Sequence, residues 1–321
     1  MRYESIGLPM ELRHLRYFIA VAEELHFGRA ALQLGISQPP LSQQIQALED
    51  ELGVRLFERT NRRVALSEVG RLFLPEARQV LAQLDKAVDV ARRAQRGEVG
   101  ELKVGFTSSA PFTSTIPRAI QAFRLACPAV HLDLCELSSR GVAEAVAEGR
   151  LQVGMLRPLE AMPAGLEALE LFAEELVAVL PAGHPLACRE AGIELAELAA
   201  EAFVFFPRSF GTGLYDQLLD LARAAGFTPR IVQEASEAMT LIGLVATGLG
   251  VTVLPASFSR MRIDGVVCRT LRDAGASTAV WLVRRRDEAS PLVQRFAALL
   301  EGEARQAQAL RAMAVDAHSR S

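Results

Sequence analysis

The chain has 321 residues, of which 50% are hydrophobic, and this is enough for two or three domains with packed cores. No apolar run approaches the roughly 18 residues that a membrane helix needs, and the N-terminus carries charges where a secretory signal would be apolar. We therefore expect a cytoplasmic protein with no membrane partner. The net charge of -3 gives no overall basic signal, so a nucleic-acid partner would have to be bound by a local basic patch.

The first nine residues, MRYESIGLP, precede a second methionine, Met10. Two interpretations of residues 1–9 remain open: they form an unstructured N-terminal arm, or the native chain starts at Met10. From Glu11 the sequence predicts a helix, because apolar side chains recur at helical spacing. This stripe consists of Leu12, Leu15, Phe18, Ile19, Ala22 and Leu25.

A tight turn and a second well-marked helix follow. Gly35 turns the chain before Ser37, which is a favourable N-cap residue. Pro39 and Pro40 stand in the first helical turn, where backbone N–H groups have no intrahelical partner and proline costs little. Two helices joined in this way indicate a helix-turn-helix, although an ordinary capped helix in a small helical domain would show the same spacing. The apolar positions that continue the helix are Leu41, Ile45, Leu48 and Leu52.

Two short extended runs come after these helices. They are VRLFER and RVALS, and a polar turn with Arg59, Arg62 and Arg63 joins them. A basic two-stranded hairpin beside a helix-turn-helix suits the minor groove and the phosphates of DNA. The runs therefore predict a wing, which supplies the local basic patch that the net charge conceals.

Residues 10–70, MELRHLRYFIAVAEELHFGRAALQLGISQPPLSQQIQALEDELGVRLFERTNRRVALSEVG, resemble over their whole length the winged helix-turn-helix of the LysR-type transcriptional regulators, and we expect the DNA-binding domain at residues 10–67. The resemblance implies that double-stranded promoter DNA is a partner and that Arg29 contacts its phosphates. Gln43 stands where family members often have arginine, and this removes a charged, bidentate reader of guanine. The residues implied at the DNA are Arg29, Ser37, Gln38, Pro39, Pro40, Ser42 and Gln43, with Arg59, Arg62 and Arg63 of the wing on the flanking DNA.

A long linker helix is predicted over residues 68–97. Its apolar positions are spaced as in a coiled-coil seam, although a helix packed on its own domain would also explain them. The resemblance favours the seam and implies a homodimer or homotetramer. Pro75 lies about two turns inside, where a kink is expected. The seam positions are Leu74, Leu81, Leu84, Val88 and Ala91.

Strand-like and helix-like segments alternate from Glu101 onward. Strands are predicted at LKVGF, VHLDLCEL and LQVGML with helices between them, and a second set runs from ELVAVLP to VTVLP. Such alternation predicts parallel sheets flanked by helices. We expect an α/β effector domain over residues 98–305, with lobe I at about 98–170 and 275–305 and lobe II at about 171–274. The tail, residues 306–321, either extends the last helix or is disordered.

Ligands of such folds bind at the carboxyl ends of the strands, and three hydroxyl-bearing loops are expected there. These loops are TSSAPFTST, SSRG and PRSFGTG. Hydroxyl groups and free helix N-termini suit a carboxylate or another anion, although ordinary helix capping explains any single serine. The three loops together favour an anion site.

This half resembles the LysR effector domain, a two-lobed fold similar to periplasmic binding proteins. GLVATGLGVTVLPAS and FFPRSFGTGLYDQL resemble the branch that responds to muconate-type intermediates of aromatic catabolism. By that resemblance two serines bind an effector carboxylate, an arginine flanks the hinge side, and residues 207–210 close from the opposite lobe. Ser139 replaces a common threonine, so a non-aromatic effector of another pathway remains open. The implied residues are Ser108, Ser109, Ser139, Arg157, Pro207, Arg208, Ser209 and Phe210.

Two other functional classes fit less well. An enzyme would need catalytic residues, but the chain has no GxSxG elbow, no GxxxxGK[ST] loop and only an incomplete GxGxxG. The 4 cysteines and 5 histidines form no pattern of metal ligands, so we expect no catalytic residue, metal or cofactor. A small-solute receptor would share the two lobes but would need export. The expected mechanism is a switch, in which effector binding changes how paired DNA-binding domains sit on a promoter and recruit RNA polymerase.

Overall fold

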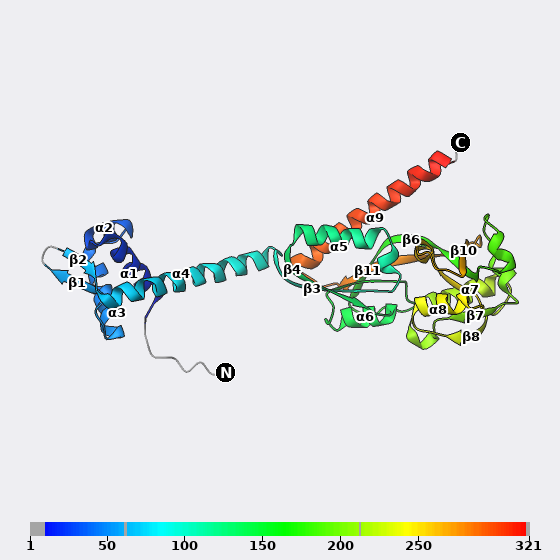
Figure 1. Ribbon diagram of the computed structural model, residues 1–321, viewed down its shortest axis with the longest axis horizontal. Helices are drawn as coiled ribbons and strands as arrows, with labels where there is room; N and C mark the ends of the chain where they lie inside the picture. The colour runs from blue at the N-terminus through cyan, green and yellow to red at the C-terminus, as the bar shows by residue number, and fades with distance from the viewer. Residues whose placement is uncertain (1–9, 61–62, 212, 319–321) are drawn as a thin grey trace. The chain divides into compact units, whose positions relative to one another are not determined.

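The computed structural model describes residues 10–60, 63–211 and 213–318 of the chain (Figure 1). Its contacts divide the chain into an N-terminal unit, residues 1–93, and a C-terminal unit, residues 94–321. Among the described residues, no helix combines the length and the apolar character needed to cross a membrane.

The N-terminal unit is a winged helix-turn-helix, as the sequence predicts. The two strands pair antiparallel, with Thr60 opposite Arg63, and so form the predicted hairpin. Phe18 is fully buried, and its ring centroid lies 5.4 Å from that of Phe57 and 5.2 Å from that of Phe73. The elements are α1 (Leu12–Glu24), α2 (Phe27–Gln33), α3 (Gln38–Leu52), β1 (Phe57–Thr60) and β2 (Arg63–Leu66).

The helix α4 (Glu68–Gln95) begins at the predicted residue and ends two residues before the predicted limit, with Pro75 inside it. Its first part packs on the core of the N-terminal unit through Leu74, Ala77 and Leu81. Val88, farther along, is exposed. Packing on its own domain therefore explains part of the apolar spacing, and the rest of the predicted seam lies on the exposed part of the helix.

A seven-stranded sheet organises the C-terminal unit, in the order β10-β6-β11-β5-β3-β4 with β9 paired to β6. A separate parallel pair joins β7 (Ala202–Phe205) to β8 (Arg230–Glu234). The strands of the large sheet are β3 (Val99–Phe106), β4 (Ala129–Glu136), β5 (Val153–Leu156), β6 (Leu166–Pro181), β9 (Thr252–Pro255), β10 (Val266–Thr270) and β11 (Ser277–Arg285).

The prediction of wholly parallel sheets is wrong. β3 is parallel to β4 and β5, whereas β11 is antiparallel to β5 and β6, and β6 is antiparallel to β9 and β10. Parallel neighbours need a long crossover, usually a helix, and the chain enters both β6 and β11 without one. The alternation of strands and helices that motivated the prediction is therefore interrupted at these two strands.

The strands β6 and β11 run through two hydrophobic cores, and this divides the C-terminal unit into lobes. One core contains Phe172 of β6 and Val280 of β11, and the other contains Leu176 of β6 and Ala276 just ahead of β11. The lobes therefore meet inside these strands.

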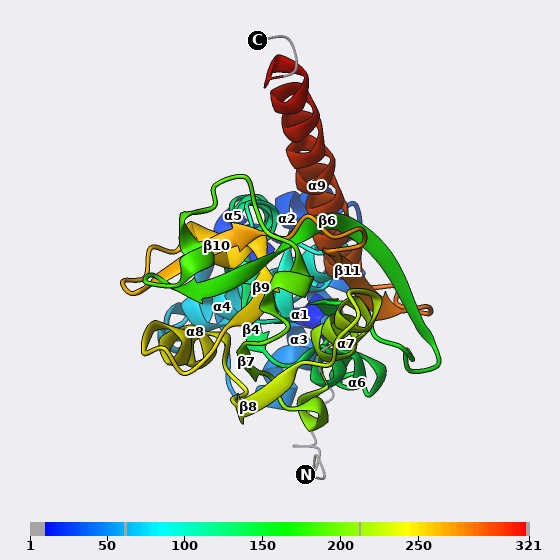
Figure 2. The same cartoon turned by 90° about the vertical axis from the view of Figure 1, so that its right-hand side faces the viewer.

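Helices cover both faces of the sheet in lobe I. α5 (Thr115–Ala126) and α9 (Pro291–His318) lie on one face, and α6 (Ser139–Ala147) lies on the other (Figures 1 and 2). Lobe II holds α7 (Gly213–Ala224) and α8 (Ala238–Ala246). Since α9 continues to His318, residues 306–318 of the tail extend the last helix.

Candidate functional site

The N-terminus of α3 exposes most of the predicted base-reading residues. Ser37 takes the N-cap position, and Gln38, Pro39 and Pro40 form the first turn. These four residues and Gln43 are exposed, whereas Ser42 is half-buried. The exposed residues thus come from the first two turns of one helix.

Ser37 caps α3 by position, but its side chain makes no capping hydrogen bond within the described residues, contrary to the expected role. An N-cap hydroxyl normally accepts a hydrogen bond from the backbone N–H of the second or third helical residue. Those residues are Pro39 and Pro40, which have no N–H. The two prolines therefore leave the Ser37 hydroxyl available to a partner outside the helix.

The predicted arginines of this unit differ in their surroundings. Arg29 is exposed on α2, and its Nε donates to the Glu24 carboxylate over 2.8 Å. Arg63 is exposed on β2, and Arg62 lies outside the described residues. Arg59 was predicted in the turn of the wing, but it lies in the strand β1. The basic groups of the wing are thus not equivalent.

Arg59 is held by the interior of its own domain. Its Nη2 lies 2.9 Å from the carboxylate of Glu49, and its guanidinium carbon lies 5.0 Å from the ring centroid of Phe27. Glu49 is only 5% exposed and also accepts hydrogen bonds from the backbone N–H groups of Leu56 and Phe57, over 2.8 and 3.0 Å. Glu49 therefore ties α3 to the wing. The sequence did not identify Glu49 as a structural residue, because an acidic residue next to the apolar positions of a helix is usually exposed to solvent.

In the C-terminal unit, a cavity of about 270 Å³ opens between the lobes. Several predicted effector residues line it: Ser108, Ser109, Ser139, Arg157 and Phe210. The remaining lining residues were not singled out by the sequence, although Thr107 and Ser138 belong to two of the predicted loops. They are Thr107, Glu136, Leu137, Ser138, Phe206, Leu214, Ser236, Glu237 and Phe258.

Arg157 is the polar centre of this cavity, and it pairs with Glu174 of β6, the strand in which the two lobes meet. It is 2% exposed, and its Nη2 donates to Ser109 Oγ over 2.7 Å and pairs with the Glu174 carboxylate. Its backbone N–H donates to Ser139 Oγ over 3.2 Å. Burial lowers the pKa of the Arg157 guanidinium below its ordinary value, and the adjacent Glu174 opposes this effect.

Two donors of this arginine have no partner. Nε and Nη1 of Arg157 are buried, and neither makes a hydrogen bond within the described residues. Leaving a buried charged donor unpaired costs more than about 1–3 kcal/mol. Ser109 and Ser139 each accept from Arg157, so their hydroxyl protons remain able to donate. The hydroxyl groups of Ser109 and Ser139 can therefore donate to a ligand that carries acceptor oxygens.

The segment 207–210 contributes less to the cavity than predicted. Phe210 lines it, but Pro207, Arg208 and Ser209 are not among its described lining residues. Arg208 is exposed, and its guanidinium lies 3.5 Å from the carboxylate of Asp216. The short 3-10 helix Arg208–Phe210 turns only its last side chain inward. Beside it, the backbone N–H of Arg140 donates to Gly211 O over 3.2 Å and joins the two lobes.

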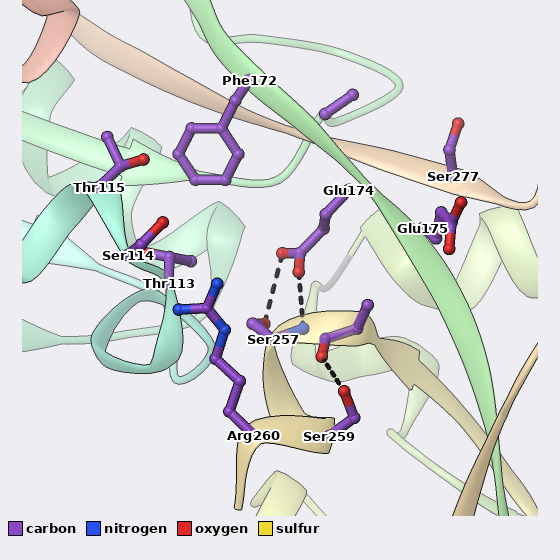
Figure 3. Close-up of a pocket in the computed structure, with 12 residues that line it drawn as sticks. Thr113, Ser114, Thr115, Phe172, Glu174, Glu175, Ser257, Ser259, Arg260 and Ser277 are labelled. Atoms are coloured by element: carbon purple, nitrogen blue, oxygen red, sulfur yellow. Dashed lines mark hydrogen bonds between the residues drawn. The ribbon is translucent and has the colours of Figure 1, made fainter. Parts of the chain in front are cut away.

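A second cavity, of about 620 Å³, has Glu174 among its lining residues (Figure 3). Glu174 accepts from the backbone N–H of Ser257 over 2.7 Å and from its hydroxyl over 3.4 Å, and Figure 3 shows Arg260 extending toward Thr113 and Ser114. Because Glu174 lines this cavity and pairs with Arg157 in the other, the buried ion pair forms part of the wall between them.

Two carboxylates stand at the first cavity from opposite lobes. Glu136 ends β4 in lobe I, and Glu237 precedes α8 in lobe II. Burial raises the pKa of the Glu136 carboxyl above its ordinary value, and the negative charge of Glu237 raises it further. Both side chains are exposed, so these charges lie toward the mouth of the cavity. No group of residues able to hold a metal ion occurs in the described part of the chain.

Comparison with known proteins places both units in one family. A family model described as "Bacterial regulatory helix-turn-helix protein, lysR family" matches residues 12–71. A second, described as "LysR substrate binding domain", matches residues 95–305. The two matches together cover both units of the structure.

Individual relatives span nearly the whole chain. The Escherichia coli protein named uncharacterized HTH-type transcriptional regulator YnfL is 50% identical over 290 residues, covering 90% of this chain and 97% of its own. The Bacillus subtilis HTH-type transcriptional regulator AlsR is 39% identical over 289 residues, covering 89% and 94%. The solved structure of full-length CbnR complexed with its target DNA has a TM-score of 0.79 at 30% identity, covering 92% of this chain and 100% of that one.

Proposed function

The chain belongs to the LysR family of ligand-responsive transcriptional regulators, and from this premise we propose that it reads promoter DNA with α3 and the wing under the control of a ligand bound beside Arg157. The observation that carries the proposal is the unpaired state of Arg157 Nε and Nη1, buried beside the hydroxyls of Ser109 and Ser139. A carboxylate would satisfy these donors. A ligand of this kind favours whichever arrangement of the lobes holds it best.

On the DNA, Ser37, Gln38, Pro39, Pro40 and Gln43 face the major groove in this proposal. The proline rings contact thymine methyl groups, and the side-chain amides and the uncapped Ser37 hydroxyl bond to base edges. Arg29, Arg62 and Arg63 contact phosphates, as does the positive end of the α3 dipole. Arg59 acts indirectly, since it braces the wing against Glu49.

The DNA role is tested on a duplex selected from a random pool by the full-length protein, with a scrambled duplex as reference. Pro40→Ala and Gln43→Ala should each lower the preference for the selected duplex by about 1–3 kcal/mol. Arg29→Ala should weaken binding to both duplexes and reduce the salt slope by about 1. Gln46→Ala, an exposed glutamine of the same helix, serves as control. Equal losses on both duplexes for all of these variants would contradict the assignment of base-reading residues.

We propose a small carboxylate as the effector, with muconate-type and benzoate-type acids from aromatic catabolism as the first class and a non-aromatic acid as the alternative. At about 100 times its dissociation constant a ligand adds roughly 2.7 kcal/mol of stability. A thermal shift produced by such an acid should disappear in Ser109→Ala. A shift that survives this substitution would place the ligand elsewhere.

Pairing of two chains along the exposed part of α4, and contact with RNA polymerase, complete the proposal. Val88 and Val90 are exposed on this helix and give it apolar surface beyond the N-terminal core. Substitution of Val88 by Glu should shift the full-length protein toward monomer in sedimentation velocity, with Asp85→Glu as a control that keeps the charge of an exposed position. A solute receptor is the distant alternative, and failure to select any DNA sequence would favour it.

A further inference from the structure

The charges around the first cavity do not match a ligand that is only an anion. The charged residues among those that line it are Glu136, Arg157 and Glu237, and the positive charge of Arg157 is already neutralised by Glu174. Among the lining residues that the structure describes, the two carboxylates therefore have no counter-charge. A dianion entering this cavity would meet repulsion at its mouth, even though Arg157 offers donors at its centre.

Neither carboxylate has a structural task that explains its place. Glu237 is the N-cap residue of α8, yet its side chain makes no capping hydrogen bond within the described residues. No ion pair or hydrogen bond engages the side chain of Glu136 in the same part of the chain, where Glu237 is instead a like charge. Like charges at close range destabilise the arrangement that brings them together. Such an arrangement is relieved by a cation placed between them.

The cavity also has a size that limits what it holds. Its volume of about 270 Å³ corresponds to roughly nine water molecules at about 30 Å³ each. A molecule of amino-acid size fits this volume, and Arg157 and both carboxylates are among the residues that line it. The apolar side chains of Phe206, Phe210 and Phe258 are available for its hydrocarbon part.

We propose that the ligand of this cavity is a small aminocarboxylate, whose carboxylate binds Arg157, Ser109 and Ser139 and whose ammonium group lies between Glu136 and Glu237. This inference rests on the proposed ligand site, and it replaces the dianionic muconate-type acids by acids that also carry an ammonium group. Because Glu136 belongs to lobe I and Glu237 to lobe II, the ammonium group would also draw the two lobes together. Glu136 and Glu237 then determine the preference for an aminocarboxylate, whereas Arg157 binds the carboxylate group that all these ligands have in common.

The test compares ligands that differ only at one end. The first pair is 6-aminohexanoate and adipate, and the second is 4-(aminomethyl)benzoate and 4-carboxyphenylacetate. Their affinities for the full-length protein are measured by titration calorimetry at low salt, where exposed charges are least screened. In at least one pair the aminocarboxylate should bind more tightly than the dicarboxylate by about tenfold, equivalent to about 1.4 kcal/mol.

Two double variants decide which carboxylates are responsible. Glu136→Gln/Glu237→Gln should reduce the preference for the aminocarboxylate from about tenfold to less than about threefold. In free energy, this is a fall from about 1.4 kcal/mol to less than about 0.7 kcal/mol. Glu144→Gln/Glu234→Gln removes the same number of charges from exposed positions that do not line the cavity, and it should keep the preference. Trp281 fluorescence during urea unfolding verifies that each variant is folded.

Three results would overturn the inference: no binding of either aminocarboxylate, equal or tighter binding of both dicarboxylates, or a preference that survives the removal of Glu136 and Glu237. The outcome for the proposed function is separate. Dicarboxylate binding that depends on Ser109, together with selective DNA binding, would leave the regulator proposal intact while this inference fails. Loss of DNA selectivity would instead remove the regulator proposal, whatever the ligand.

Discussion

Replacing Arg157 by methionine should strongly destabilise the C-terminal unit, because Glu174 would become a buried charge without its cation. Glu174 is 8% exposed, and the partners that remain to it are the backbone N–H and the hydroxyl of Ser257, at 2.7 and 3.4 Å. Removing one member of a buried ion pair costs about 3–5 kcal/mol. The Glu174→Gln variant should lose a similar amount, since Arg157 then has no counter-charge.

The double variant Arg157→Met/Glu174→Gln carries neither charge, so it should be more stable than the sum of the single losses predicts. In the double variant neither charge is left buried without its partner, which is the main cost in each single variant. Residues in one buried network show coupling energies of about 0.5–3 kcal/mol, and we expect a value near 2–3 kcal/mol here.

The assay uses the protein's single tryptophan, Trp281, which lies on β11 and therefore reports only on the C-terminal unit. With a urea slope of about 2.5 kcal/mol/M, a loss of about 3–5 kcal/mol lowers the unfolding midpoint by about 1–2 M. Arg150→Met is the matched control, because Arg150 pairs with Glu148 at the surface and should contribute less than about 0.5 kcal/mol. The reasoning is refuted if Arg157→Met behaves like this control, or if the single losses simply add in the double variant.

The remaining predictions concern the wing, a close backbone contact and one carboxyl group. Glu49→Ala should expose the Leu56 and Phe57 amides to faster hydrogen exchange and lower stability by about 1–3 kcal/mol for each amide left unpaired, whereas exposed Asp50→Ala should change exchange little. Gly213→Ala should lower the free energy of unfolding of the C-terminal unit by more than about 1 kcal/mol, since its Cβ would lie 1.8 Å from the backbone oxygen of Pro158; an unchanged fluorescence-detected midpoint would contradict this contact. Burial and the charge of Glu237 raise the pKa of Glu136 above the ordinary 4.5, so its neutral form stabilises the folded state at low pH. This stability is lost as the pH rises from 4.5 through the raised pKa, and the unfolding midpoint should fall over that range. In Glu136→Gln the midpoint should not show this fall.

The elements of the N-terminal unit could be predicted almost completely, because their signals are local. Helical spacing at Leu41, Ile45 and Leu48, a turn at Gly35 and a basic hairpin each depend on residues close in sequence. The structure places these three apolar side chains fully inside the core. The side-chain contacts were not predictable in the same way. Glu49 accepts hydrogen bonds from the amides of Leu56 and Phe57, and the spacing of apolar residues gives no sign of this contact.

The strand pairing of the C-terminal unit was predictable only where strands and helices alternate. The parallel neighbours β3, β4 and β5 follow that rule, but the antiparallel direction of β6 and β11 depends on which strands pair across the finished sheet. Spacing along the chain carries no information on that choice. The long β6 was consequently anticipated only in its C-terminal part.

The sequence by itself determined the helix-turn-helix, the wing, the linker helix and the hydroxyl-bearing loops, because local periodicity, capping and turn chemistry specify each of them. Only the tertiary structure decided which polar groups meet and which remain unpaired. It brought Arg157 between Ser109 and Ser139, paired it with Glu174, and set Glu136 opposite Glu237 across the lobes. Desolvation and charge interactions depend on distance in space, so the chemistry of the cavity arises from residues that are far apart in the chain.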